Sequence, residues 1–230
     1  MRAYFIYLLI ISVTMLGCSQ EICRQGRQFA LQPGDLLFQD LDAGPLCDAI
    51  KKVTIGFEGA NFSHVGIVAE DRGGLVVVEA ASAGVQVTPL RTFMQRSRDA
   101  RGHPKVTVGR LKEQYRYLIP SALKEAFALQ GKPYDKVFAI NNDAYYCSEL
   151  VYEVFLRANN NKPVFGLEPM TFKEPDSGKT HPAWEDYFSG LGIPIPEGQP
   201  GINPGGISRS DVLTIVYTYG IVTRNQVGDN

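Results

Sequence analysis

Three side chains in this sequence have the types that nucleophilic catalysis by a thiol requires. The chemistry needs a thiolate, a base that generates it and a third group that holds the base in its useful tautomer. Cys147 lies in Tyr-Tyr-Cys-Ser-Glu-Leu-Val at the start of a helical pattern, where the positive end of the helix dipole favours a thiolate. The candidates are therefore Cys147 as nucleophile, His64 as base and Glu79 as orienting group. The alternative for Cys147 is a small buried hydrophobic residue.

His64 is the histidine whose surroundings are rigid enough to fix an imidazole ring. It lies in Asn-Phe-Ser-His-Val-Gly-Ile-Val, within a strand predicted over 63–70. His103 and His181 each precede a proline in a polar loop. The alternative for His64 is a half-buried structural histidine without chemistry.

A predicted hairpin brings Glu79 to His64. Two β-branched runs, 63–70 and 75–82, flank the turn sequence Asp-Arg-Gly-Gly at 71–74. If the loop has an even number of residues, both side chains leave the same face of the sheet. They then lie roughly 4.5 to 8 Å apart, either directly opposite or as diagonal neighbours. An odd-length loop would place them on opposite faces, and Glu79 would then be a strand-end carboxylate that faces solvent.

The elements around this hairpin predict one α+β domain, with a small antiparallel sheet packed against helices. A Pro-Gly turn at 33–34 leads into a short strand that ends at Phe38. The further predicted elements are a helix over 45–57, strands over 85–90 and 105–111, a helix from Pro120 to Gly131, a helix after Cys147, a loop over 189–206 and a strand over 211–219.

Composition excludes several other classes of protein. The chain has 230 residues, of which 44% are hydrophobic, and this is ordinary for a globular protein and unlike a disordered chain. The formal charge of -1 offers no clustered basic face for a nucleic-acid partner. No metal-ligand spacing and no phosphate-binding glycine loop is present, so we expect no cofactor and no metal.

The N-terminal segment predicts export. An apolar run after Arg2 is too short to span a membrane and has the form of a signal peptide over 1–17. The sequence Met-Leu-Gly-Cys that ends at Cys18 resembles the lipobox of bacterial lipoproteins, although Met15 stands where Leu is usual. That resemblance implies lipidation of Cys18 and, with Ser19 following, an outer-membrane location facing the periplasm. The alternative is an ordinary cleaved signal.

Export makes the remaining cysteines informative, because an oxidising compartment favours disulfides. Cys23 and Cys47 are able to pair with each other, and whether they do is left open. That pairing would leave Cys147 as the odd thiol, which is a further sign of a reactive cysteine.

Four ordered segments resemble the circularly permuted, YiiX/YebB-like branch of the NlpC-type papain-like cysteine peptidases and amidases. In that branch the His segment precedes the Cys segment, as it does here. The segments are Pro-Gly-Asp-Leu-Leu-Phe at 33–38, Ser-His-Val-Gly-Ile at 63–67, Val-Glu-Ala at 78–80, and Gly-Lys-Pro-Tyr-Asp at 131–135 leading to Cys147. Together they span residues 31 to 157. The resemblance implies a permuted papain-like fold over 31–230, after a tether over 18–30.

The resemblance also implies roles for single residues. It makes Cys147 the nucleophile at the start of a helix, His64 the general base and Glu79 the group that orients the imidazole. The Tyr134 hydroxyl and the Cys147 backbone N–H would bind the oxyanion of the tetrahedral intermediate. We expect Tyr146 and Ser63, the neighbours of Cys147 and His64, to contact substrate. The alternative for Tyr134 is a core aromatic residue.

The function we expect is that of a cell-envelope thiol hydrolase that cleaves amide bonds in the stem peptides of peptidoglycan. Its partners would be that peptide or amide substrate and the membrane, through the lipid anchor at Cys18. One alternative is an acyltransferase on lipid or amine substrates, and another is a non-catalytic module that binds peptides or amino acids. An insertion at about 158–206 matches no segment of the family and would form a lid or a wall of the substrate site.

Overall fold

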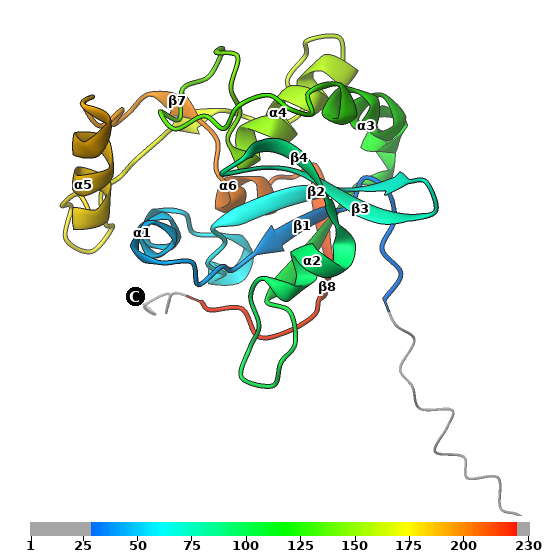
Figure 1. Ribbon diagram of the computed structural model, residues 1–230, viewed down its shortest axis with the longest axis horizontal. Coiled ribbons are helices and arrows are strands. Elements are labelled where there is room, and N and C mark those ends of the chain that lie inside the picture. The colour runs from blue at the N-terminus through cyan, green and yellow to red at the C-terminus, as the bar shows by residue number, and fades with distance from the viewer. Residues whose placement is uncertain (1–28, 225–230) are drawn as a thin grey trace, which may run out of the picture. The chain divides into compact units, whose positions relative to one another are not determined.

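The computed structural model describes residues 29–224 of the chain. Six antiparallel strands form the central sheet in the order β4-β3-β2-β1-β5-β8, and two short strands form a second sheet (Figure 1). The strands of the central sheet are β1 (Leu36–Gln39), β2 (His64–Asp71), β3 (Gly74–Ala81), β4 (Gly84–Pro89), β5 (Val106–Leu111) and β8 (Leu213–Thr218). The second sheet pairs β6 (Glu168–Pro169) with β7 (Pro200–Gly201). The predicted α+β class with an antiparallel sheet is confirmed.

Six α-helices surround the sheet in the described part of the chain. They are α1 (Pro45–Val53), α2 (Leu90–Gln95), α3 (Ile119–Ala128), α4 (Cys147–Ala158), α5 (Pro182–Leu191) and α6 (Pro204–Ser208), and the 3-10 turns η2 (Phe57–Gly59) and η3 (Glu113–Leu118) accompany them. Helix α4 packs on β2, β3 and α3, whereas α2 packs on β3 and β4. Helix α5 lies next to α1, at the left of Figure 1. None of these helices is long and apolar enough to cross a bilayer.

Burial of β-branched and aromatic side chains explains why the sheet and α4 pack together. All four residues of β1 are buried, and the first six residues of β2 are buried as well. Such continuous burial is expected for inner strands covered on both faces. Helix α4 buries Leu150, Val151, Val154 and Phe155, which recur at helical spacing and form one apolar face. The start of α4 is thereby fixed against the sheet.

The hairpin of β2 and β3 has the even-length loop that the sequence predicts. Asp71 pairs with Gly74, so the loop consists of two residues, and Gly73 there has a φ of 115° that favours glycine. In this register, Ile67 lies opposite Val78. His64 and Glu79 are therefore diagonal neighbours on one face, which is one of the two predicted arrangements.

The predicted loop over 189–206 is wrong in part, because it holds the end of α5, strand β7 and the start of α6. Its prolines and glycines were expected to break regular structure. Pro204, however, is the first residue of α6, a position whose N–H has no acceptor within the helix, so the missing N–H of proline costs nothing there. Asn203 caps this helix, since its Oδ1 accepts a 2.7 Å hydrogen bond from the Gly206 N–H. Helix α5 begins with Pro182 in the same way.

The helix expected over 45–57 ends earlier, at Val53. Gly34, with a φ of 90°, and Asp35 form the turn before β1, as expected, and Arg110 holds the buried Asp35 carboxylate. The predicted signal peptide, Cys18 and Cys23 lie outside the described residues. Cys47 has a free thiol in the structure.

Candidate active site

The fold brings Cys147, His64 and Glu79 together. Cys147 is the first residue of α4, His64 the first residue of β2, and Glu79 lies within β3. The His64 Nε2 and Glu79 Oε2 atoms are 2.6 Å apart, and the imidazole also hydrogen-bonds to the Cys147 side chain. Because Nε2 faces Glu79, Nδ1 is the ring nitrogen left for the sulfur. The imidazole therefore bridges the thiol and the carboxylate.

A glycine in β2 leaves space for this bridge. A Cβ atom placed on Gly66 would lie 2.4 Å from Val77 Cγ1 and 3.4 Å from Glu79 Cβ. Any side chain at Gly66 would thus collide with β3 next to Glu79. Because Gly66 has no side chain, the Glu79 carboxylate can reach along the sheet to its diagonal neighbour, His64.

The Glu79 carboxylate is fully buried, and polar side chains from two further elements satisfy it. Thr88 and Gln86 on β4 donate to Oε1, Thr88 at 2.5 Å and Gln86 at 3.3 Å. Arg96, directly after α2, donates to both carboxylate oxygens. Oε2 accepts from both His64 and Arg96, so the carboxylate is held on three sides.

The electrostatics of this group favour an ion pair between the thiol and the imidazole. Burial opposes protonation of His64, but the hydrogen bonds to Cys147 and Glu79 outweigh it and raise its pKa to about 9. Burial likewise opposes ionisation of Cys147, yet His64 and the Val65 N–H lower the pKa of the thiol. Despite its burial, Glu79 has a lowered pKa because His64 and Arg96 stabilise the carboxylate. A thiolate and an imidazolium can therefore coexist near neutral pH.

The structure places the other predicted site residues around the same sulfur. Ser63, Tyr134 and Tyr146 line one cleft with His64 and Cys147. Burial and the nearby Cys147 raise the pKa of Tyr134, so its hydroxyl keeps its proton and can donate. The Tyr146 hydroxyl accepts a 3.2 Å hydrogen bond from the Ile202 N–H, and the Ser63 hydroxyl accepts one from the Leu41 N–H.

The cleft beside Cys147, which we call the Cys147 cleft, has a volume of about 200 Å³. Most of its walls are apolar and aromatic, and they come from α1, from the segment before α4 and from the segment between β6 and α6. The apolar lining residues are Ile50, Val53, Ile55, Tyr134, Phe138, Tyr146, Pro169, Met170, Phe172, Trp184, Ile202 and Pro204. The segment at 158–206 therefore supplies a wall of the cleft.

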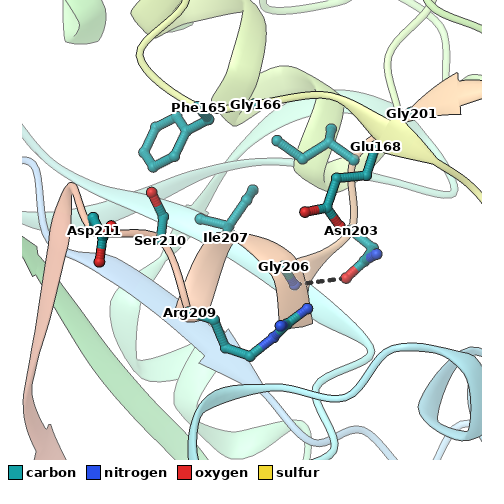
Figure 2. A pocket seen from close by; sticks show the side chains of 11 residues that line it. Phe165, Gly166, Glu168, Gly201, Asn203, Gly206, Ile207, Arg209, Ser210 and Asp211 are labelled. Atoms are coloured by element: carbon teal, nitrogen blue, oxygen red, sulfur yellow. Dashed lines mark hydrogen bonds between the residues drawn. The ribbon is translucent and has the colours of Figure 1, made fainter.

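A second, more polar pocket adjoins the Cys147 cleft, and we call it the polar pocket (Figure 2). It has a volume of about 250 Å³, and Glu168, Arg209 and Asp211 contribute charged side chains to it. Both cavities are lined by Glu168, Ile202, Asn203 and Arg209. A substrate seated at Cys147 can therefore extend past Asn203 into a charged environment.

The residues predicted from sequence did not include Arg96, Thr88 and Gln86. One signal was available, because Gln86 and Thr88 are polar residues two apart in a strand and so share a face. Gln86 pairs directly with Glu79 in the sheet. Arg96 had no such signal, since its place depends on how α2 packs against the sheet.

Glu149, two residues after Cys147, is a second buried carboxyl group near the site. Burial raises its pKa to about 8, and its Oε2 accepts a 3.3 Å hydrogen bond from the Tyr146 N–H.

The raised pKa of Glu149 makes folding stability depend on pH. Between about pH 4.5 and 8 the folded chain binds a proton at Glu149 that the unfolded chain has lost, so folding stability falls as the pH rises. Thermal unfolding of wild type and Glu149→Gln at pH 5 and pH 8 checks this. We expect wild type to lose stability relative to Glu149→Gln over that interval, and a constant difference would contradict the expectation.

The chain belongs to a family of permuted papain-like amidases. The family model described as "Permuted papain-like amidase enzyme, YaeF/YiiX, C92 family" matches residues 30–217. This match covers the central sheet, α4 and the residues that line both cavities. The match confirms the permuted papain-like branch that the resemblance indicated.

Two relatives from Escherichia coli are similar to this chain. The uncharacterized protein YiiX of strain K12 is 29% identical over 132 residues, which cover 56% of this chain and 61% of that protein. The match thus spans less than two thirds of the relative. A crystal structure entitled metalloprotein yiiX, from strain O157:H7, has a TM-score of 0.66 and 24% sequence identity, and the alignment covers 84% of this chain and all of the other. This second likeness confirms the permuted papain-like fold.

The second of these relatives is described as a metalloprotein, which raises the question whether the residues of this chain suit a metal ion. Between residues 29 and 224, no group of three or more His, Cys, Asp and Glu side chains is arranged to hold one. The Glu79 carboxylate, the acid nearest to His64, is already bound by Arg96 and Thr88. The donor set of the described residues does not fit a metal site.

Proposed function

We propose that this chain is a cell-envelope thiol hydrolase that cleaves an amide bond, with Cys147 as nucleophile, His64 as general base and Glu79 as orienting group. The observation that carries the proposal is the His64 imidazole, hydrogen-bonded on one side to Glu79 and on the other to Cys147. Membership in a family of amidases supports the reaction class. The most suitable substrates are peptides like the stem peptides of peptidoglycan.

In the proposed reaction the Cys147 thiolate attacks the carbonyl carbon of the amide, and the carbonyl oxygen becomes an oxyanion. The His64 imidazolium gives its proton to the amide nitrogen, the C–N bond breaks, and the amine leaves a thioester on Cys147. Water, deprotonated by the now neutral His64, attacks the thioester. The acid departs and the thiol is regenerated. Glu79 keeps the imidazole in the tautomer that faces the sulfur.

Two donors are available for the oxyanion. The Cys147 N–H belongs to the first turn of α4, whose N–H groups have no acceptor within the helix. The Tyr134 hydroxyl in the Cys147 cleft is the second. Both would act on charge that develops during the reaction, when a donor has its largest effect.

Removing the Tyr134 hydroxyl tests this assignment. We expect Tyr134→Phe to lower kcat roughly 100-fold with little change in KM, because the donor acts on the transition state. Steady-state kinetics on the cleaved amide check this, with Tyr117→Phe as the control, since Tyr117 is 71% exposed and outside the cleft. An unchanged kcat would assign Tyr134 to packing alone.

Acyl transfer is the second candidate, and the apolar lining of the Cys147 cleft favours it. The Trp184 side chain is buried in this wall, and its Nε1 has no hydrogen-bond partner among the described residues. The indole N–H is an unsatisfied donor beside apolar side chains. It suits a bound acyl group, whose carbonyl oxygen can accept a hydrogen bond from it. The thioester would then be intercepted by an amine in place of water.

One experiment distinguishes these functions. The full-length chain is incubated with peptidoglycan stem peptides and with N-acyl amides, with and without added amines, and the products are identified by mass spectrometry. New carboxyl ends that do not depend on amines support hydrolysis, whereas amine adducts support transfer. Saturable binding of peptides or amino acids without any product would indicate the binding module and would overturn the hydrolase.

The envelope location rests on the sequence before residue 19. We propose that Cys18 carries the lipid anchor, which is supported by the apolar run and the Cys that ends it. Metabolic labelling with a fatty acid is expected to mark wild type and to leave Cys18→Ala unmarked. Equal labelling of the two proteins would overturn the anchor.

A further inference from the structure

Helix α2 covers one side of the His64–Glu79 pair. Its Phe93 side chain is fully buried, and the Phe93 and His64 ring centroids are 5.9 Å apart. Arg96 follows one turn later, with its guanidinium carbon 5.3 Å from the centroid of the same Phe93 ring. The Gln39 side chain donates a 2.8 Å hydrogen bond to the Phe93 carbonyl and ties α2 to β1. Arg96 is therefore held on a fixed element at a set distance from the imidazole.

The Arg96 guanidinium holds the Glu79 carboxylate in a fork. Its Nη1 donates to Oε2 at 2.6 Å, and its Nη2 donates to Oε1. The same Oε2 accepts from His64 Nε2. Rotation of the carboxylate away from His64 would break both Arg96 hydrogen bonds at once, so the fork fixes the direction in which Glu79 meets the ring.

We propose that Arg96 is a positioning residue of the active site, which fixes Glu79 against His64 and whose charge sets the pH at which the Cys147 thiolate forms. This inference rests on the proposed function, because it concerns the same thiol and imidazole. Neither the family match nor the sequence pattern assigns a role to Arg96. Arg96 acts through Glu79 and His64 and need not touch substrate.

The sign of the effect follows from the charges that face the pair. Glu79 on β3 is anionic, Arg96 beside α2 is cationic, and Cys147 on α4 ionises; Gln86 and Thr88 on β4 are neutral. Tyr134 stays protonated, because burial raises its pKa. When Glu79, Cys147, His64 and Arg96 are all ionised, their charges sum to zero, and without Arg96 the sum is -1. Loss of the Arg96 cation therefore favours the protonated forms of Cys147 and His64 and moves formation of the Cys147 thiolate to higher pH.

The test is the pH dependence of Cys147 alkylation by iodoacetamide in the full-length chain, followed by mass spectrometry of the Cys147 peptide. We expect the midpoint in Arg96→Gln to rise by about one pH unit, which is about tenfold less thiolate on the acidic side of the wild-type midpoint. Arg96→Lys, which keeps the charge, is expected to recover most of that shift. Arg98→Gln is the matched control, because Arg98 is exposed and donates to the Gly102 carbonyl.

A second readout detects positioning without a substrate. The His64 Nε2–H shared with Glu79 is expected to give a low-field proton NMR signal in wild type, and Arg96→Lys is expected to broaden or lose it, because an ammonium cannot reproduce the planar fork. This readout tests the positioning role of Arg96 even if circular dichroism shows that Arg96→Gln does not fold. A low-field signal in Arg96→Lys equal to that of wild type would overturn the positioning role.

The outcomes separate this inference from the proposed function. If Cys147 of wild type titrates as an ordinary thiol, the proposed function itself fails. If wild-type Cys147 is activated and folded Arg96→Gln has the same midpoint, only the role of Arg96 is overturned. An equal shift in Arg98→Gln would also overturn it, because the shift would then not depend on the fork.

Discussion

Replacing Cys147 by alanine is expected to abolish amide hydrolysis and to leave the fold intact. The substitution removes the sulfur that attacks the carbonyl carbon, so the rate should fall by a factor on the order of 10³ or more. Cys147 is a small side chain that is 7% exposed, and losing one sulfur atom at such a place should cost on the order of 1 kcal/mol of stability. Product analysis by mass spectrometry and a thermal melt measure the two effects.

Cys47 provides the matched control for this prediction. It is the other free thiol of the described residues, and burial raises its pKa, so it should remain a protonated and unreactive thiol. We expect Cys47→Ala to keep the hydrolytic rate. Full activity in Cys147→Ala would place the nucleophile elsewhere. Loss of activity in Cys47→Ala would then point to Cys47.

Replacing Glu79 by glutamine is expected to impair both reactivity and stability. An amide can face His64 with its NH₂ group, which would stabilise the wrong imidazole tautomer, and it brings no negative charge to support the imidazolium. The hydrolytic rate should therefore fall by a factor on the order of 10² to 10⁴. The folded state should lose roughly 1–3 kcal/mol, less than a fully buried pair would, because the Arg96 side chain is 26% exposed.

Denaturant unfolding and the pH profile of Cys147 alkylation measure these effects. Glu70→Gln is the control, because Glu70 lies in an exposed part of the same hairpin and pairs with Leu75 far from the imidazole. If Glu79→Gln alkylates with the wild-type midpoint, Glu79 does not support the ion pair, and its role would be structural only.

The sequence was sufficient for the hairpin and for α4, because both depend on short-range patterns. An even-length turn and the two-residue period of a strand put His64 and Glu79 on one face, and the register confirms it. The apolar spacing after Cys147 predicts the helix that begins there. These local signals include the residues of the proposed triad, so most of the candidate site was accessible from sequence.

The other parts of the site depend on contacts between segments that are distant in the chain, and local sequence patterns do not predict such contacts. Helix α2 has six residues and no side-chain cap, so no local pattern predicts it, and Arg96 meets Glu79 only after α2 packs on β3 and β4. Whether residues 158–206 form a lid or a wall of the site was left open by the sequence for a related reason. Trp184 lies on α5 and Met170 directly after β6, and the two line one cleft with Cys147 only in the folded chain. Proline in this segment starts helices α5 and α6, whereas the sequence pattern predicts a loop without regular structure over 189–206.

The pH dependence of alkylation at Cys147 in wild type and in His64→Ala tests the central claim most directly. The pKa of His64 is raised to about 9, so the imidazolium exists below that pH, and the lowered pKa of Cys147 supplies the thiolate. The proposed function predicts that wild-type Cys147 reacts well below the ordinary thiol pKa of about 8.5, and that His64→Ala loses this reactivity while His103→Ala keeps it. An ordinary titration of wild-type Cys147, or undiminished reactivity in His64→Ala, would contradict it.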